Sequence, residues 1–114
     1  MITSLDGPDY GIARNENHVV VEWTDGDKKV VFSFTRHGKA ISAHFACPKT
    51  SLRQVKPAIV EFSNWVQKAC PWMEYLVAQV RKPSVKRIMP KCGFDLLAIV
   101  PEGDVFYRRT HGIH

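Results

Sequence analysis

The sequence predicts an α+β domain built on a twisted, mainly antiparallel sheet with helices on both faces. Two observations carry this prediction. Residues 18–46 alternate apolar and polar side chains with the period of β-strands, and residues 52–69 change to the period of a helix. With 114 residues, of which 45% are apolar and 24% charged, the chain is long enough for one hydrophobic core. We therefore expect a single domain with the order βββαβαββ.

The two ends of the chain lack such patterns. Residues 1–17 contain glycine, proline and polar residues without a sustained period, so we expect an irregular arm with at most a short strand and little core. Residues 110–114 are expected to form a short tail. The folded domain is therefore predicted to span residues 18–109.

Three strands of a meander open this domain. The first runs from His18 to the dipeptide Asp25-Gly26, which is a hairpin signal. The second has an apolar side formed by Val30, Phe32 and Phe34. The third spans Lys39 to Ala46 and alternates again.

The strongest periodic signal predicts the main helix. Apolar residues across 52–69 follow spacings of 3 and 4, which places them on one helical face. A capping box at residues 51–54 would allow an early start, but Pro57 is tolerated only near the first turn. We place the start near Lys56 and the end before Pro71, because the residue preceding a proline is disfavoured in a helix.

The remaining elements are shorter. A mostly apolar strand is expected from Glu74 to Val80, and a short helix from Ser84 to Cys92 with Gly93 as its C-terminal cap. Two strands, Leu96 to Val100 and Val105 to Tyr107, complete the sheet.

Composition limits the function classes. A net charge of +5 and a pI near 9.3 favour an anionic partner, which could be nucleic acid, an acidic protein or a phosphorylated cofactor. No apolar run is long enough to span a membrane, and no signal-peptide pattern opens the chain, so we expect a cytoplasmic protein. The three cysteines are widely spaced and predict neither a disulfide framework nor a zinc site.

The predicted order, together with the string VRKPSVKRIMPKCGF, resembles the second half of the GNAT N-acetyltransferases. In that family a strand leads to an Asn-containing turn, a short helix and a Gly-Phe pair, which Gly93-Phe94 matches. The resemblance covers residues 18–109 and implies acetyl-CoA as cofactor, with an amine attacking the thioester directly. Its compact form is similar to GNAT-like proteins encoded by phages, which would place it in the host cytoplasm or in the virion.

The resemblance also implies a cofactor site. The pantetheine arm of acetyl-CoA would lie where the strands Lys39 to Ala46 and Glu74 to Val80 splay apart. The pyrophosphate would lie at a turn that the family writes Gln/Arg-x-x-Gly-x-Gly/Ala, matched here by residues 53–58 with Lys56 in place of the central glycine. The implied cofactor-binding residues are Phe45, Ala46, Arg53, Gln54, Val55, Lys56, Ala58, Lys82 and Lys86.

The sequence departs from the family's pattern at further positions. The usual Asn falls at Lys82, and the tyrosine that protonates the departing thiolate falls at Met89, which cannot transfer a proton. The N-terminal arm is also shorter than the family's first strand and helix pair. An open groove would follow, which suits a protein side chain or terminus better than an enclosed metabolite.

Two residues are candidates for the catalytic base. His44 faces away from the apolar side of the third strand, where a neutral imidazole could accept a proton from an amine. A surface histidine without catalytic role is the alternative. Glu22 on the first strand is a second candidate. His44 and Cys47 have an H-x-x-C spacing, but no further pair of ligands is evident, so we expect no metal site.

The basic run Arg81 to Lys91 has three interpretations: a solvated helix face, a contact to CoA phosphate, or a nucleic-acid patch. Nothing in the sequence matches an RNA-binding motif with stacking aromatics, so nucleic acid is the least favoured partner. Two functions stay open. One is an acyl-CoA-dependent N-acetyltransferase that acts on a macromolecule. The other is a non-catalytic protein of the same fold that binds an acidic protein partner or has a structural role.

Overall fold

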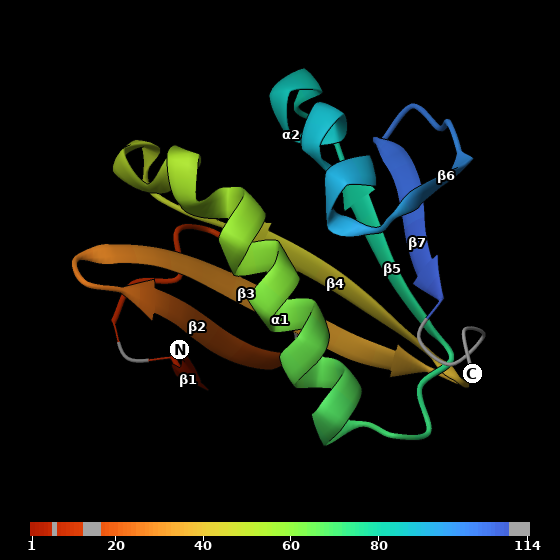
Figure 1. Cartoon of the computed structure of the whole chain (residues 1–114), viewed down its shortest axis with the longest axis horizontal. Helices are drawn as coiled ribbons and strands as arrows, with labels where there is room; N and C mark the ends of the chain where they lie inside the picture. Colours follow the sequence, from red (N-terminus) through yellow and green to blue (C-terminus); the bar gives the residue numbers. More distant parts are fainter. Residues whose placement is uncertain (6, 13–16, 110–114) are drawn as a thin grey trace.

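The computed structural model describes residues 1–5, 7–12 and 17–109, which form one seven-stranded sheet with two α-helices packed on it (Figure 1). The strand order is β1-β2-β3-β4-β5-β7-β6. Within the described residues β4 and β5 pair in parallel, and the other neighbouring strands pair antiparallel. The strands are β1 (Ile2–Ser4), β2 (Val19–Asp25), β3 (Lys28–His37), β4 (Ala40–Ala46), β5 (Tyr75–Val80), β6 (Asp95–Ala98) and β7 (Asp104–Arg109). The α+β class and the mainly antiparallel sheet are confirmed.

The main helix α1 (Val55–Ala69) connects β4 to β5 and packs over the meander β2 to β4 (Figure 1). It begins one residue before the predicted Lys56 and ends before Pro71, as the spacing predicted. The Phe62 ring stacks on Phe32 of β3, with centroids 4.2 Å apart and planes nearly parallel. Apolar residues on one face of α1 and one face of the meander thus form a shared core.

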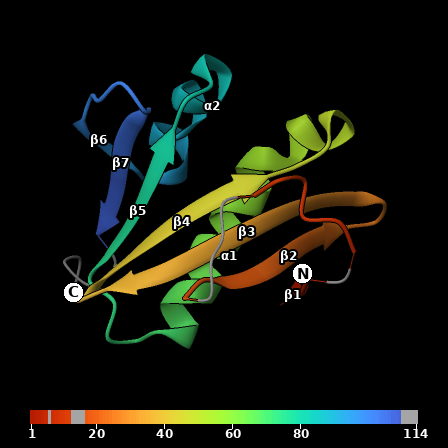
Figure 2. The same cartoon turned by 180° about the vertical axis from the view of Figure 1, so that it is seen from behind.

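The second helix differs from its prediction in two ways. It divides into α2 (Pro83–Ile88) and a 3₁₀ helix η2 (Pro90–Cys92), because Pro90 has no N–H with which to continue the α-helix. It also packs on the same face of the sheet as α1, so the expectation of helices on both faces is wrong (Figures 1 and 2). The Cys92 thiol lies 3.9 Å from the Lys56 carbonyl oxygen of α1, and the apolar residues of both helices join one cluster.

Strand β1 pairs with β2 at the edge of the sheet. Residues 7–12 then lie across the face of β3 and β4 that the helices leave open (Figure 2). Ile12 is buried there, although the sequence led us to expect little core from residues 1–17. The arm therefore covers part of the face that the helices leave open. The predicted tail at residues 110–114 lies outside the described residues.

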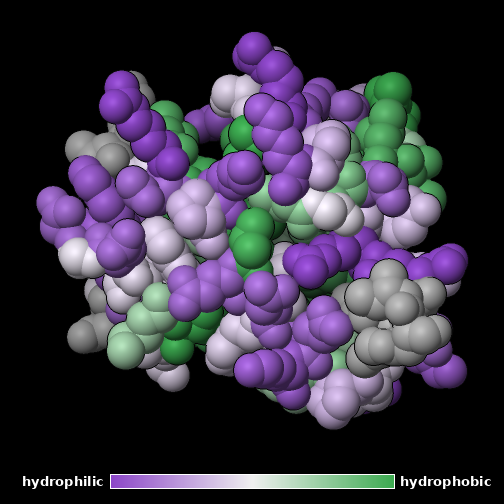
Figure 3. Space-filling model, in the orientation of Figure 1, coloured by the Kyte–Doolittle hydropathy of each residue, from purple (hydrophilic) through white to green (hydrophobic). Residues whose placement is uncertain are grey.

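The last two strands form the far edge of the sheet. Strand β6 begins one residue before the predicted Leu96 and ends earlier than predicted, and β7 extends beyond the predicted 105–107. Three large apolar side chains of this edge are exposed, and a hydrophobic patch lies over β6 (Figure 3). They are Leu96, Leu97 and Ile99. An exposed apolar patch on an edge strand marks a surface suited to another molecule.

We expect Phe62→Ala to lower the free energy of unfolding by about 3–5 kcal/mol, because it removes the ring on which Phe32 stacks and leaves a cavity beneath α1. Urea denaturation measures this change. The matched control is Leu97→Ala on exposed β6, which should alter stability by no more than about 0.5 kcal/mol. Equal losses in the two variants would contradict the assignment of the α1 interface as the main core.

Candidate functional site

The parallel pair β4 and β5 separates along its length. Their register runs from Ala40 opposite Tyr75 to Ala43 opposite Ala78 and ends there. Both strands continue, to Ala46 and Val80, and diverge toward the ends that lead into the helices (Figure 1). Beyond Ala43, the backbone N–H and C=O groups of β4 that face β5 are therefore no longer paired with that strand.

A groove with a volume of about 520 Å³ lies at this divergence. Its walls come from four parts of the chain: the end of β4, the end of β5, the arm, and residues at the starts of the helical segments. The described lining residues that carry its chemistry are Tyr10, His44, Cys47, Gln79, Arg81 and Lys82. A concave space of this size with a few convergent polar groups is the usual form of a small-molecule site.

His44 lies on β4 opposite Ser33 of β3 and lines this groove. Its ring centroid is 6.2 Å from that of His18. Burial lowers the pKa of the His44 imidazole below its ordinary value, and the neighbouring His18 lowers it further. The imidazole is therefore neutral near pH 7, the form that can accept a proton.

Glu22, the second candidate base, lies elsewhere. Its carboxylate forms an ion pair of 2.8 Å with the Lys29 ammonium, and both side chains are largely buried. Glu22 is not among the described residues that line the groove. The structure thus separates the two candidates and brings His44 alone to the site.

The predicted phosphate turn is not assembled as the resemblance implied. A 3₁₀ helix, η1 (Lys49–Gln54), runs directly into α1, and the Val55 N–H donates to the Leu52 carbonyl. Pro57 contributes no N–H at all. The first turn of α1 therefore offers fewer free amides to an anion than an ordinary helix start.

The side chains of this turn are dispersed as well. Val55 and Ala58 are buried in the core, whereas Arg53 and Lys56 are exposed. Neither these residues nor Gln54 are among the described residues that line the groove, whereas Leu52 of η1 is. Phe45 and Ala46, by contrast, line the groove as expected from their place on β4.

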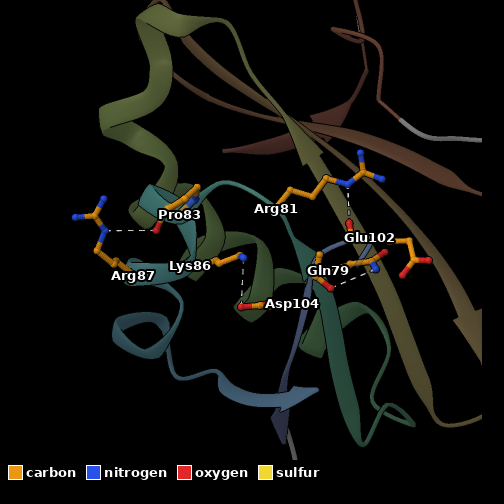
Figure 4. Close-up of polar contacts among 8 residues, drawn as sticks. Gln79, Arg81, Pro83, Lys86, Arg87, Glu102 and Asp104 are labelled. Carbon is orange, nitrogen blue, oxygen red and sulfur yellow. Dashed lines mark hydrogen bonds and ion pairs between the residues drawn. The ribbon is translucent and has the colours of Figure 1, made fainter. Parts of the chain in front are cut away.

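Two cationic side chains stand at the β5 end of the groove. Arg81 and Lys82 belong to its lining, and the Arg81 Nε donates to the Glu102 carbonyl at 2.6 Å (Figure 4). Lys86, a predicted cofactor contact, is not among the described residues that line the groove, and its ammonium pairs with the Asp104 carboxylate at 3.4 Å (Figure 4). The positive charge available to a ligand here thus comes from the turn between β5 and α2.

Met89 takes no part in the groove. It is buried and lines a separate apolar hollow between α1 and the sheet, with Phe62 and Phe94 among its neighbours. Tyr10, Cys47 and Gln79 also line the groove, although the sequence did not identify them as candidate site residues, whereas Arg81 belongs to the basic run that could contact CoA phosphate. Tyr10 lies in a turn-like stretch, yet nothing in the sequence showed that this stretch would return to β4.

Within the described residues, no group of three or more His, Cys, Asp or Glu side chains could hold a metal ion. The same part of the chain contains no helix that is long and apolar enough to cross a membrane.

The fold is that of the GNAT acetyltransferases, as comparison with solved structures shows. A ribosomal-protein alanine N-acetyltransferase from Escherichia coli superposes with a TM-score of 0.70 at 12% identity, over 96% of this chain and 93% of that chain. A spermidine N-acetyltransferase from Vibrio cholerae gives 0.66 at 10% identity, over 84% and 68%. A Bacillus subtilis acetyltransferase in complex with CoA gives 0.64 at 13% identity, over 82% and 78%. No family model and no curated protein matches the sequence.

The His44 imidazole is expected to titrate below its ordinary pKa of 6.5, which NMR measures directly. His18→Gln should raise this pKa only in part, because burial is the larger cause. Between the lowered pKa and 6.5 the unfolded chain binds a proton that the folded chain does not, so the free energy of unfolding falls as pH drops through that window. His44→Gln should remove this dependence.

The control for this titration is His37→Gln at the exposed end of β3, which should leave the pKa of His44 unchanged. A His44 that titrates at or above 6.5 would contradict the burial assigned to it.

Proposed function

We propose that this protein is an acyl-CoA-dependent N-acetyltransferase in which an amine attacks the thioester directly. The observation that carries the proposal is the groove between the diverging β4 and β5, with the neutral imidazole of His44 in its wall. The shared fold supports it, since the neighbours of that fold are acetyltransferases by name.

The groove suits the extended, amide-bearing arm of acetyl-CoA. The unpaired edge of β4 beyond Ala43 can exchange backbone hydrogen bonds with the amides of such an arm, as an added strand would. Arg81 and Lys82 would attract its phosphate groups at the β5 end. This arrangement replaces the phosphate turn at residues 53–58, whose side chains lie away from the groove.

The chemistry follows from the groove's own groups. His44 takes the proton from the acceptor amine, the nitrogen bonds to the carbonyl carbon, and the carbon–sulfur bond breaks. Burial raises the pKa of the Cys47 thiol, so this thiol stays protonated and is a poor nucleophile. Direct transfer is therefore favoured over a route through an acylated cysteine.

We also propose a macromolecular acceptor. On the acceptor side the described wall of the groove consists of the arm residues Tyr10, Gly11 and Ile12, with no helix above them. Such a shallow wall leaves room for a protein side chain or terminus that is attached to a larger body.

Isothermal titration calorimetry with acetyl-CoA tests the proposal. We expect binding at micromolar concentration, about −8 kcal/mol, and thermal stabilisation of the protein. His44→Gln should lower kcat about 10²-fold or more while acetyl-CoA still binds, because the variant lacks the base but keeps the groove. His37→Gln is the matched control and should retain activity. Absence of both heat and stabilisation with the wild-type protein would overturn the proposal.

A non-catalytic interaction protein of the same fold is the second candidate. Two observations favour it: the exposed apolar patch formed by Leu96 and Leu97 of β6 with Ile99 just after it, and the 3₁₀ helix in which the Val55 N–H is already hydrogen-bonded. Arg81 and Lys82 at the groove would then bind an acidic partner, which is also what the net charge of +5 favours.

Association with an acidic protein would become weaker as the salt concentration rises, because salt screens the charges. Association through the apolar patch at β6 would persist at high salt, and the Leu97→Lys variant would lose it because it places a charge in that patch. Size-exclusion chromatography at two salt concentrations, run beside the acetyl-CoA titration, separates these cases. A protein that associates in this way without binding acetyl-CoA supports the second candidate. A monomer that binds acetyl-CoA and acetylates a test amine eliminates it.

A further inference from the structure

The arm presents a tyrosine to the groove in an unfavourable backbone conformation. Tyr10 has a φ of 53° and Gly11 a φ of 73°, both in the left-handed region. The Ile12 N–H donates to the Asp9 carbonyl at 3.1 Å, and the Gly11 N–H donates to the Asp9 carboxylate at 3.0 Å. Asp9 to Ile12 thus form a tight turn with two left-handed central residues, positions that Asn, Asp and Gly normally fill.

Among the residues that the structure describes, Tyr10 is the one residue other than glycine that has a positive φ. A bulky side chain is disfavoured in this region, and such strain persists only where the surrounding structure holds it. Here the hold comes from the two hydrogen bonds of the turn and from Ile12, which is only 8% exposed on the back of the sheet. Tyr10 itself is 39% exposed and lines the groove.

The proposed reaction leaves one chemical requirement unmet. When the carbon–sulfur bond breaks, the departing thiolate needs a proton, and Met89 is buried and has none to give. Apart from His44, which takes the amine proton in the proposed step, three described side chains of the groove could give one: the Tyr10 phenol, the Cys47 thiol and the Lys82 ammonium. A guanidinium such as that of Arg81 does not release its proton. Tyr10 differs from Cys47 and Lys82 in its strained, left-handed backbone conformation.

We propose that Tyr10 is the proton donor of this groove, supplied by the arm in place of the helix position that Met89 occupies. The inference rests on the proposed acetyl transfer. As the amine nitrogen bonds to the carbonyl carbon and His44 takes the amine proton, the Tyr10 hydroxyl gives its proton to the departing sulfur. Solvent water then reprotonates the phenolate, and His44 releases its proton to solvent.

Two variants of Tyr10 separate the hydroxyl from the strain. Tyr10→Phe keeps the ring and the backbone conformation but has no proton to donate, and we expect kcat to fall about 10²-fold with acetyl-CoA affinity unchanged. Tyr10→Asn also lacks the phenol, but asparagine tolerates a positive φ, so its melting temperature should exceed that of Tyr10→Phe. The high-pH limb of the kcat profile should change in both variants.

The matched control is Tyr107→Phe on β7, which removes a hydroxyl outside the described lining of the groove and should keep wild-type activity. Cys47→Ala and Lys82→Met test the competing donors. The inference is overturned if wild-type protein acetylates an amine and Tyr10→Phe does so within about twofold of it. It is also overturned if kcat at saturating acetyl-CoA falls about 10²-fold in Cys47→Ala or Lys82→Met instead, since weaker acetyl-CoA binding alone leaves that kcat unchanged. A Tyr10→Asn variant no more stable than Tyr10→Phe would overturn it as well.

Failure of the proposed function gives a different result, because wild-type protein would then show no heat with acetyl-CoA and no turnover, and Tyr10 would have no thiolate to protonate. That outcome overturns both proposals. Active wild-type protein with an active Tyr10→Phe overturns this one alone.

Discussion

The parallel pairing of β4 with β5 is the constraint on which the rest of the structure depends. Adjacent parallel strands cannot be joined by a tight turn, so the chain must cross over the sheet between them, and α1 is that crossover. The Glu74 N–H donates to the Lys39 carbonyl at 2.7 Å and brings the two strands together at their start. At the other end each strand leads into a different helical segment, and the pair separates. The groove is the space that this separation leaves.

Burial at the divergence sets the chemistry of the groove. The imidazole of His44 is partly withdrawn from water, which disfavours its charged form and keeps it neutral. The same effect keeps the Cys47 thiol protonated, while the nearby Lys82 charge opposes that shift without reversing it. A neutral imidazole and a protonated thiol in the same groove are the states that the proposed direct transfer requires.

The N-terminal residues and Met89 both contribute to the packing of this structure. In the described part of the chain both α-helices lie on one face of the sheet and residues 7–12 lie on the other, where Ile12 is buried and Tyr10 lines the groove. Met89 is buried and fills the core between α1 and the sheet. Residues near the start of the chain thus complete a groove whose other walls come from β4 and β5.

The sequence by itself determined the local elements, because the periods of strands and helices follow from backbone geometry alone. The meander, the extent of α1 within one residue, and the cap at Gly93, whose φ is 87°, could all be predicted this way. The place of the groove between β4 and β5 could also be predicted, because the order of the elements resembles that of the GNAT acetyltransferases.

Only the tertiary structure decided which faces and which side chains meet. The apolar stripe of α2 does not say on which side of the sheet it will pack, and the motif at residues 53–58 does not reveal that η1 takes up the Val55 amide. Lys86 matched a cofactor position in sequence but pairs with Asp104 in space. Tyr10 and the buried Ile12 line a groove together with the end of β4, more than 30 positions further along the chain. These contacts join residues far apart in the chain, and local periodicity carries no information about them.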